Sequence, residues 1–175
     1  SLKLFAHVGI IGKPNAGKST FLSKISKARP KIADYPFTTL HPILGIARQF
    51  DKEIILADIP GLIEGAHEGR GLGDKFLAHI ERCKILLHIL DSSDPAWFQN
   101  YNTIKNELKK YGHKLSEKKE IIALNKSDLS SNYIHMIQKE LKKITGEKPL
   151  IISSFSEQGL EELMQILFEE CDQNN

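Results

Sequence analysis

The sequence contains a glycine-bounded loop whose residue types suit phosphate binding. Gly12-Lys13-Pro14-Asn15-Ala16-Gly17-Lys18-Ser19 fits the spacing G-x-x-x-x-G-K-[ST]. Its glycines let backbone N–H groups turn inward around phosphate oxygens, and a helix that begins near Lys18 points its positive dipole end at the same anion. The Lys18 ammonium is expected to reach the β- and γ-phosphates, while the Ser19 hydroxyl ligates Mg²⁺ and Thr20 completes the nucleotide contacts. The apolar strand before the loop favours this interpretation over a glycine turn ahead of an ordinary helix.

A second polar segment, Asn125-Lys126-Ser127-Asp128, follows an apolar strand and can select the base. An aspartate carboxylate accepts two hydrogen bonds from the N1–H and 2-amino groups of guanine, whereas adenine has neither donor. The alkyl stem of Lys126 can lie along the purine ring. Ser153-Ser154-Phe155 ends the last strand, where a backbone N–H could meet the guanine O6. Together these segments predict GTP and GDP as ligands rather than adenine nucleotides.

Two further segments are candidates for contact with the metal and the γ-phosphate. Asp58 ends an apolar strand, where its carboxylate can hold Mg²⁺ through water, and the Gly61 N–H can reach the γ-phosphate. Thr38 or Thr39 can give the metal a second hydroxyl while the γ-phosphate is present; the alternative is that these threonines only begin a strand. The expected nucleotide contacts here are Phe37, Thr38, Thr39, Leu40, His41, Asp58, Ile59, Pro60 and Gly61. The expected metal ligands are Ser19, Thr39 and Asp58, and the expected catalytic residues are Lys18, Thr39 and Gly61.

The elements that must position these residues alternate between short apolar runs and segments of helical period. The expected strands are 6–11, 43–50, 54–57, 85–90, 121–124 and 150–152, and the expected helices lie around 104–111, 134–144 and 160–167. Asp94 before Pro95 predicts the N-cap of the first of these helices. The link 50–53 is too short for a crossover helix, so the second and third strands should pair antiparallel.

This order predicts an α/β fold, and together with the phosphate loop and Asn125–Asp128 it resembles a Ras-like P-loop NTPase, that is, a G domain. We expect three layers around a six-stranded, mostly parallel sheet with one antiparallel strand, and nucleotide at the carboxyl ends of the strands. Residues 30–42 and 60–74 fit neither pattern, and the glycines of the second segment predict mobility until a ligand orders it.

Together these stretches resemble the Obg family of GTPases. The resemblance rests on the phosphate loop, on Ala33-Asp34-Tyr35-Pro36-Phe37-Thr38-Thr39-Leu40 and on Asp58-Ile59-Pro60-Gly61-Leu62-Ile63-Glu64-Gly65-Ala66-His67. It implies a single OBG-type GTP-binding domain over residues 1–175, a slow switch that hydrolyses GTP with Mg²⁺ held by Ser19 and Thr39. It also implies a part in assembly of the large ribosomal subunit and a link to stress signalling. The alternative is a nucleotide-dependent ribosome-binding module with negligible turnover.

One residue departs from the Ras-like pattern. Leu62 follows Gly61 where Ras-like proteins have the glutamine that orients water, and leucine can neither donate nor accept a hydrogen bond. Slow unstimulated hydrolysis is therefore expected, with the water held by switch backbone groups, a monovalent cation or a partner. The Asn15 side chain could hold K⁺ against the phosphates; the alternative is that it only braces the loop through backbone hydrogen bonds.

Composition and charge exclude several other classes. The 175 residues carry a net charge of only +2, which does not by itself indicate a nucleic-acid or membrane surface. No run approaches the ~20 apolar residues of a membrane span, and no signal peptide is recognisable. Cys83 and Cys171 match no metal spacing, which indicates buried, reduced thiols in a cytoplasmic protein. His88, in an apolar strand, is expected to be a core histidine rather than a metal ligand.

The first residue is Ser1 rather than a methionine, so we expect an excised fragment, monomeric and without the N-terminal glycine-rich domain of the Obg family. Contact with the large ribosomal subunit would then require the full-length protein. The lysines between residues 105 and 119 alternate with glutamates, which favours a solvated helical face over an RNA-binding surface.

Overall fold

The computed structural model describes residues 6–34, 41–59, 74–112, 114–130 and 132–173. The strands are β1 (Val8–Ile11), β2 (Lys31–Ile32), β3 (Ile43–Gln49), β4 (Lys52–Asp58), β5 (Ile85–Asp91), β6 (Glu120–Asn125) and β7 (Leu150–Ile151). The helices are α1 (Lys18–Ile25), α2 (Asp74–Glu81), α3 (Trp97–Tyr111), α4 (Ile134–Thr145) and α5 (Leu160–Gln173). Within this part of the chain, none of the helices combines the length and apolar character that crossing a membrane requires.

The strands form one sheet in the order β2-β3-β4-β1-β5-β6-β7. β1 pairs in parallel with β4 and β5, and β6 pairs in parallel with β5 and β7. β3 is antiparallel to both of its neighbours, so among the described strands it alone runs against the others. The expected mostly parallel sheet with one antiparallel strand is therefore confirmed. The carboxyl ends of the parallel strands meet at one edge, which is where ligands bind in open α/β sheets.

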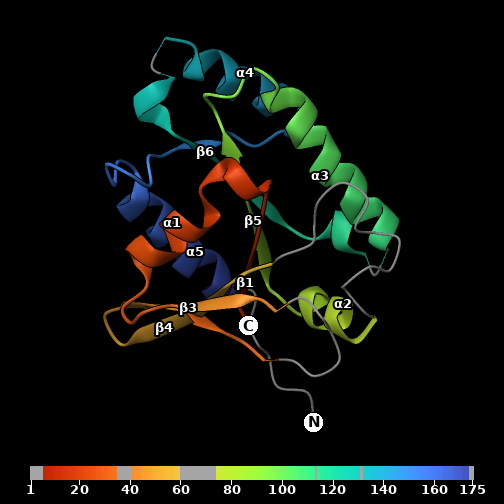
Figure 1. Cartoon of the computed structure of the whole chain (residues 1–175), viewed down its shortest axis with the longest axis vertical. Coiled ribbons are helices and arrows are strands. Elements are labelled where there is room, and N and C mark those ends of the chain that lie inside the picture. Colours follow the sequence, from red (N-terminus) through yellow and green to blue (C-terminus); the bar gives the residue numbers. More distant parts are fainter. Residues whose placement is uncertain (1–5, 35–40, 60–73, 113, 131, 174–175) are drawn as a thin grey trace.

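Alternate side chains of β5, an interior strand, pack on opposite faces of this sheet. Ile85, Leu87 and Ile89 of β5 belong to an apolar core shared with α1 and α5. Leu86 packs in a second core with α2 and α3, and Leu90 in a third with α3 and α4. The helices α1 and α5 thus cover one face while α2, α3 and α4 cover the other, which gives the expected three layers (Figure 1).

Three local features differ from the expectation. The described sheet has a seventh strand, β2, which is only two residues long and exposed on both of them, so no alternation of apolar residues marks it in the sequence. Strand β4 extends further at both ends than expected, β3 ends one residue earlier than expected at Gln49, and between them lies a two-residue turn in which Phe50 has φ +56°. Helix α2 was not predicted, because its eight residues provide too few apolar repeats to define a helical period.

The buried histidine and cysteines have the environments that the sequence indicated. His88 is completely buried; its Nδ1 lies 2.8 Å from Glu120 Oε1, and its ring stacks on Tyr101 with centroids 5.5 Å apart. Its Nε2 has no hydrogen-bond partner among the described residues. Cys83 and Cys171 are free and buried, and burial raises their pKa values to about 12 and about 11, so both thiols stay protonated at neutral pH.

Candidate functional site

The phosphate loop lies between the end of β1 and the start of α1. Its middle residues form a 3₁₀ turn at Pro14–Ala16, and α1 begins directly after Gly17, as the sequence predicted. Gly12 has φ +149°, and a Cβ at this position would lie 2.4 Å from the Ile89 carbonyl oxygen. Gly17 has φ +99°, and a Cβ there would lie 2.2 Å from Asn125 Nδ2. The path of the loop therefore requires glycine at both ends.

The amino end of α1 supplies an ammonium and a hydroxyl group to this loop. Lys18 is 8% exposed, and its Nζ lies 2.9 Å from Asp58 Oδ1. Ser19 Oγ donates a hydrogen bond to Asp58 Oδ2 at 3.4 Å. The three residues meet because β1 and β4 are parallel neighbours, with Ile10 opposite Asp58. A carboxylate beside a hydroxyl suits a hard cation such as Mg²⁺, and an ammonium at a helix N-terminus suits phosphate.

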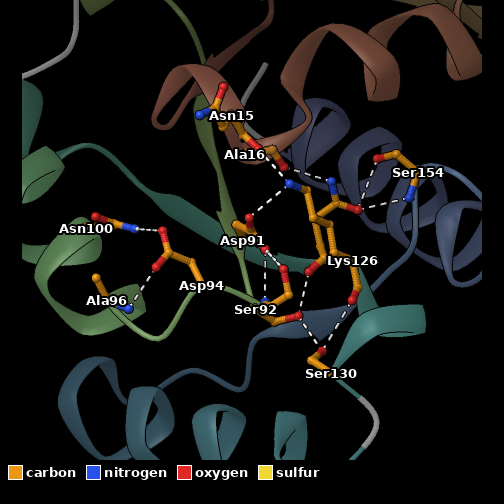
Figure 2. Close-up of polar contacts among 12 residues, drawn as sticks. Asn15, Ala16, Asp91, Ser92, Asp94, Ala96, Asn100, Lys126, Ser130 and Ser154 are labelled. Carbon is orange, nitrogen blue, oxygen red and sulfur yellow. Dashed lines mark hydrogen bonds and ion pairs between the residues drawn. The ribbon is translucent and has the colours of Figure 1, made fainter.

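Asn125 joins the phosphate loop to the loop that follows β7. The residue is 2% exposed, and its Nδ2 donates to the Ala16 carbonyl oxygen at 2.8 Å. Its Oδ1 accepts from the Ser154 N–H at 2.9 Å and from Ser154 Oγ at 3.2 Å (Figure 2). The Ser92 hydroxyl, also buried, donates to the Asn125 carbonyl oxygen at 2.5 Å. The side chain expected to contact the nucleotide thus holds two loops of the site in fixed positions.

Lys126 spans the gap between the phosphate loop and the end of β5. Its backbone has φ +64°, and its Nζ lies 2.9 Å from the Asn15 carbonyl oxygen and 2.9 Å from Asp91 Oδ2 (Figure 2). Asp91 Oδ1 in turn accepts from the Ser93 N–H at 2.9 Å and from Ser93 Oγ at 2.6 Å. The sequence analysis missed Asp91. No local pattern in the sequence marks it, because its place in the site depends on the register of the sheet, in which Asp91 lies opposite Asn125 at the ends of β5 and β6.

A cavity of 360 Å³ lies between these loops and has the dimensions of a small-molecule site. Its lining consists of Gly17, Thr20, Asn125, Lys126, Asp128, Leu129, Ser153, Ser154 and Phe155. Asp128 Oδ1 accepts a hydrogen bond from Ser153 Oγ at 3.0 Å, and Ser127 Oγ donates to Gln158 Oε1 at 2.8 Å. Leu129 and Phe155 are mostly exposed and give the cavity an apolar rim. The cavity therefore offers a fixed carboxylate, the stem of a lysine and apolar surface.

The structure brings the phosphate-loop, base and Asp58 residues to one edge of the sheet, with two differences from expectation. Ile59 is completely buried and its N–H donates to the Ile10 carbonyl, so its side chain belongs to the core and cannot contact a nucleotide. Lys13 and Pro14 line a separate cavity of 320 Å³, beside the end of β5. The predictions for Phe37, Thr38, Thr39, Leu40, Pro60, Gly61 and Leu62 lie outside the described residues, and His41 is half-buried at the start of the segment before β3.

Known proteins resemble this chain in sequence and in fold. The sequence model of a family described as 50S ribosome-binding GTPase matches residues 7–126. The solved G domain of the FeoB iron transporter of T. maritima is similar with a TM-score of 0.69 and 23% identity, over 93% of this chain and 96% of that one. The cytosolic domain of the same transporter in its GMPPNP form has a TM-score of 0.71 and 22% identity, and the match covers 96% of this chain and 64% of that one. The cytosolic domain of L. pneumophila FeoB has a TM-score of 0.68 and 18% identity, and the match covers 94% of this chain and 63% of that one.

These comparisons establish the Ras-like G-domain fold and correct the assignment to the Obg family. The similar solved structures named above are a G domain and two cytosolic domains of FeoB iron transporters, and the family whose model matches is that of 50S ribosome-binding GTPases. The phosphate loop and the Asn125–Asp128 segment serve phosphate and guanine binding in any such domain, so they indicate the class of protein but not the branch. The chain spans less than two thirds of the length of the two FeoB cytosolic domains.

Proposed function

The chain belongs to the family of 50S ribosome-binding GTPases, and on that premise we propose that this GTP-binding G domain hydrolyses GTP slowly with the help of Mg²⁺. The observation that carries the proposal is the meeting of Lys18, Ser19 and Asp58 at the amino end of α1, with Nζ 2.9 Å and Oγ 3.4 Å from the Asp58 carboxylate. The same proposal includes a single GTP-binding domain over residues 1–175 and a cytoplasmic location for the protein.

The Lys18–Asp58 ion pair places the lysine ammonium where we propose that the phosphates bind. When a triphosphate enters, the Lys18 ammonium can turn from the carboxylate to the β- and γ-phosphate oxygens, which are stronger charged acceptors. Ser19 and Asp58 would hold Mg²⁺, directly and through water, since both provide hard oxygen donors. The bound ion would neutralise charge that develops on the phosphates during transfer. Thr39 and Gly61 stay predicted contacts of the metal and the γ-phosphate.

Guanine selection follows from the cavity between the base loops. Asp128 is fixed by Ser153, and its carboxylate can accept from the N1–H and 2-amino groups of guanine. The Ser154 N–H donates to Asn125, so it is already engaged. The Phe155 N–H makes no hydrogen bond among the described residues and is the donor that we assign to the guanine O6. Adenine has no donor at these positions, so it would leave the Asp128 carboxylate unpaired.

We also propose that Asn15 holds K⁺ beside the phosphates, in place of a water-orienting glutamine. In the described structure the Asn15 side chain is exposed and makes no hydrogen bond, which does not support the alternative that it braces the loop. Single-turnover GTP hydrolysis should be faster in K⁺ than in Na⁺ at matched ionic strength, and Asn15→Ala should remove the difference while it leaves GDP affinity within about twofold. Equal rates in the two salts for the native protein would leave Asn15 without this role.

The partner proposed from the family description is the large ribosomal subunit, with a role in its assembly. The alternative within the same family is a module that binds this subunit in a GTP-dependent manner and barely turns over. Two measurements separate these functions: the single-turnover decay of GTP, and sedimentation of the full-length protein with 50S subunits in GDP or a non-hydrolysable GTP analogue. Measurable GTP decay supports the slow GTPase. No decay together with analogue-dependent sedimentation supports the binding module.

A further inference from the structure

We propose that Asp91 is a positioning residue for guanine recognition, which acts by holding the Lys126 side chain as one wall of the base cavity. The inference rests on the guanine site proposed above and adds to it a residue outside the motifs that predicted the site. Lys126 lines the base cavity, whereas Asp91 lines the neighbouring cavity beside the phosphate loop. Asp91 therefore acts on the base through the lysine and not by contact with it.

The geometry gives the Lys126 ammonium two acceptors on different elements. One is the Asn15 carbonyl oxygen in the phosphate loop, and the other is the Asp91 carboxylate at the end of β5, each at 2.9 Å (Figure 2). A lysine side chain has four rotatable bonds, and fixing it costs rotamer entropy. One neutral carbonyl holds only the tip of such a chain. A second, charge-assisted bond at a different angle fixes the direction of the stem as well.

The carboxylate is itself fixed before it meets the lysine. Asp91 Oδ1 accepts two hydrogen bonds from Ser93, so only Oδ2 is free to face Lys126. Most exposed ion pairs contribute little, because two flexible side chains must be ordered to form them. Here one partner is ordered in advance, and the pair is mostly shielded, with 16% of the Asp91 side chain and 32% of the Lys126 side chain exposed. This pre-ordering lowers the entropy that nucleotide binding must otherwise overcome.

A double-mutant cycle tests the inference, with GDP affinity measured by isothermal titration in Mg²⁺. Asp91→Ala should weaken GDP binding by about five- to tenfold, the scale of one charge-assisted bond. Lys126→Met keeps an apolar stem but loses both polar contacts, and should weaken binding at least as much. In the double variant, Asp91→Ala should add nothing further, because the lysine through which it acts is gone. Independent, additive losses would overturn the inference, since they would mean that Asp91 does not act through Lys126.

Two controls separate positioning from folding and from the proposed function. Asp94→Ala removes a nearby carboxylate that bonds to Ala96 and Asn100 rather than to Lys126, and should leave GDP affinity unchanged. The ratio of GTP to ITP affinity should stay constant in Asp91→Ala, because the 2-amino group of guanine is recognised by Asp128. If Asp91→Ala does not fold, Asp91→Asn replaces it in the double-mutant cycle, and its loss of GDP affinity should be smaller. A native protein with no preference for guanine over adenine would contradict the proposed function, whereas a guanine preference with additive losses would contradict the positioning role only.

Discussion

Replacement of Asn125 by alanine should weaken the fold even when no nucleotide is present. The side chain makes three hydrogen bonds, one to the Ala16 carbonyl oxygen and two with Ser154, and the residue is 2% exposed. Its removal leaves the Ala16 C=O and the Ser154 N–H buried without partners, and each such group costs about 1–3 kcal/mol. We therefore expect the free energy of unfolding to fall by about 2–4 kcal/mol, since small shifts and water recover part of the loss.

The assay is urea denaturation of the nucleotide-free protein, with Tm from calorimetry as a second measure. For a chain of this length, 2–4 kcal/mol corresponds to a Tm decrease of roughly 5–15 °C. Asn125→Asp should be intermediate in effect, because it keeps the acceptor for Ser154 but places a carboxylate oxygen against the Ala16 carbonyl. Ser92→Ala is the matched control: it loses the hydrogen bonds of its hydroxyl to the Asn125 carbonyl oxygen and to Ser130 Oγ and leaves the amide contacts of Asn125 intact, at a cost of about 1–2 kcal/mol.

The result that would refute this reasoning is the stability of Asn125→Ala measured without nucleotide. If Asn125→Ala weakened GDP binding but left the unfolding free energy within about 0.5 kcal/mol of the native value, Asn125 would be a ligand contact and not a link between loops. Equal destabilisation in Asn125→Ala and Ser92→Ala would also contradict the reasoning, because it would assign the stabilisation to the backbone of Asn125 and not to its amide.

Three further predictions concern the base, the metal and a buried ion pair. Asp128→Asn should weaken GDP binding and favour xanthine nucleotide, since the amide donates where the carboxylate accepted; competition titration would measure this, and unchanged base preference would contradict it. Ser19→Ala should impair Mg²⁺-dependent nucleotide binding, whereas Thr39→Ala should spare GDP and impair the GTP state; a Thr38→Ala variant with that phenotype would transfer the role to Thr38. Burial opposes ionisation of Glu120, but the hydrogen bond and charge of His88, followed by those of Lys105, outweigh it and hold the pKa of Glu120 below its ordinary value. A carboxyl with a depressed folded pKa stabilises above its unfolded pKa of about 4.5, and that stabilisation is lost as pH falls through the folded pKa. Urea denaturation should show that Glu120→Gln lowers the free energy of unfolding by about 2–3 kcal/mol at pH 7, and that this loss shrinks as the pH falls below about 4.5. A loss that is independent of pH would contradict the assignment.

Local spacing was enough to predict the parts of the site that lie close together in sequence. The phosphate loop, its helix and the base-selecting segment each fit within eight residues, and the loop geometry needs glycine where the sequence has Gly12 and Gly17. The alternation of strands and helices likewise predicted the parallel sheet and the antiparallel β3, because the link after β3 is too short for a crossover.

Contacts between distant segments could not be predicted in this way. Asp91 and Lys126 are 35 positions apart and meet only because β5 and β6 pair with Asp91 opposite Asn125. The burial of Ile59 depends on β1 lying beside β4, which no local pattern encodes. The two residues of β2 form a strand because β3 offers them an edge, and their own exposed side chains carry no strand signal.

Competition between guanine and adenine nucleotides tests the central claim most directly. The measurement is the equilibrium affinity of the native protein for GDP and for ADP, each in Mg²⁺ at one ionic strength. Because the Asp128 carboxylate would face two donors in guanine and none in adenine, GDP should bind at least about a hundredfold more tightly. Equal affinities for GDP and ADP would contradict a guanine-specific site between Asp128 and the loop after β7.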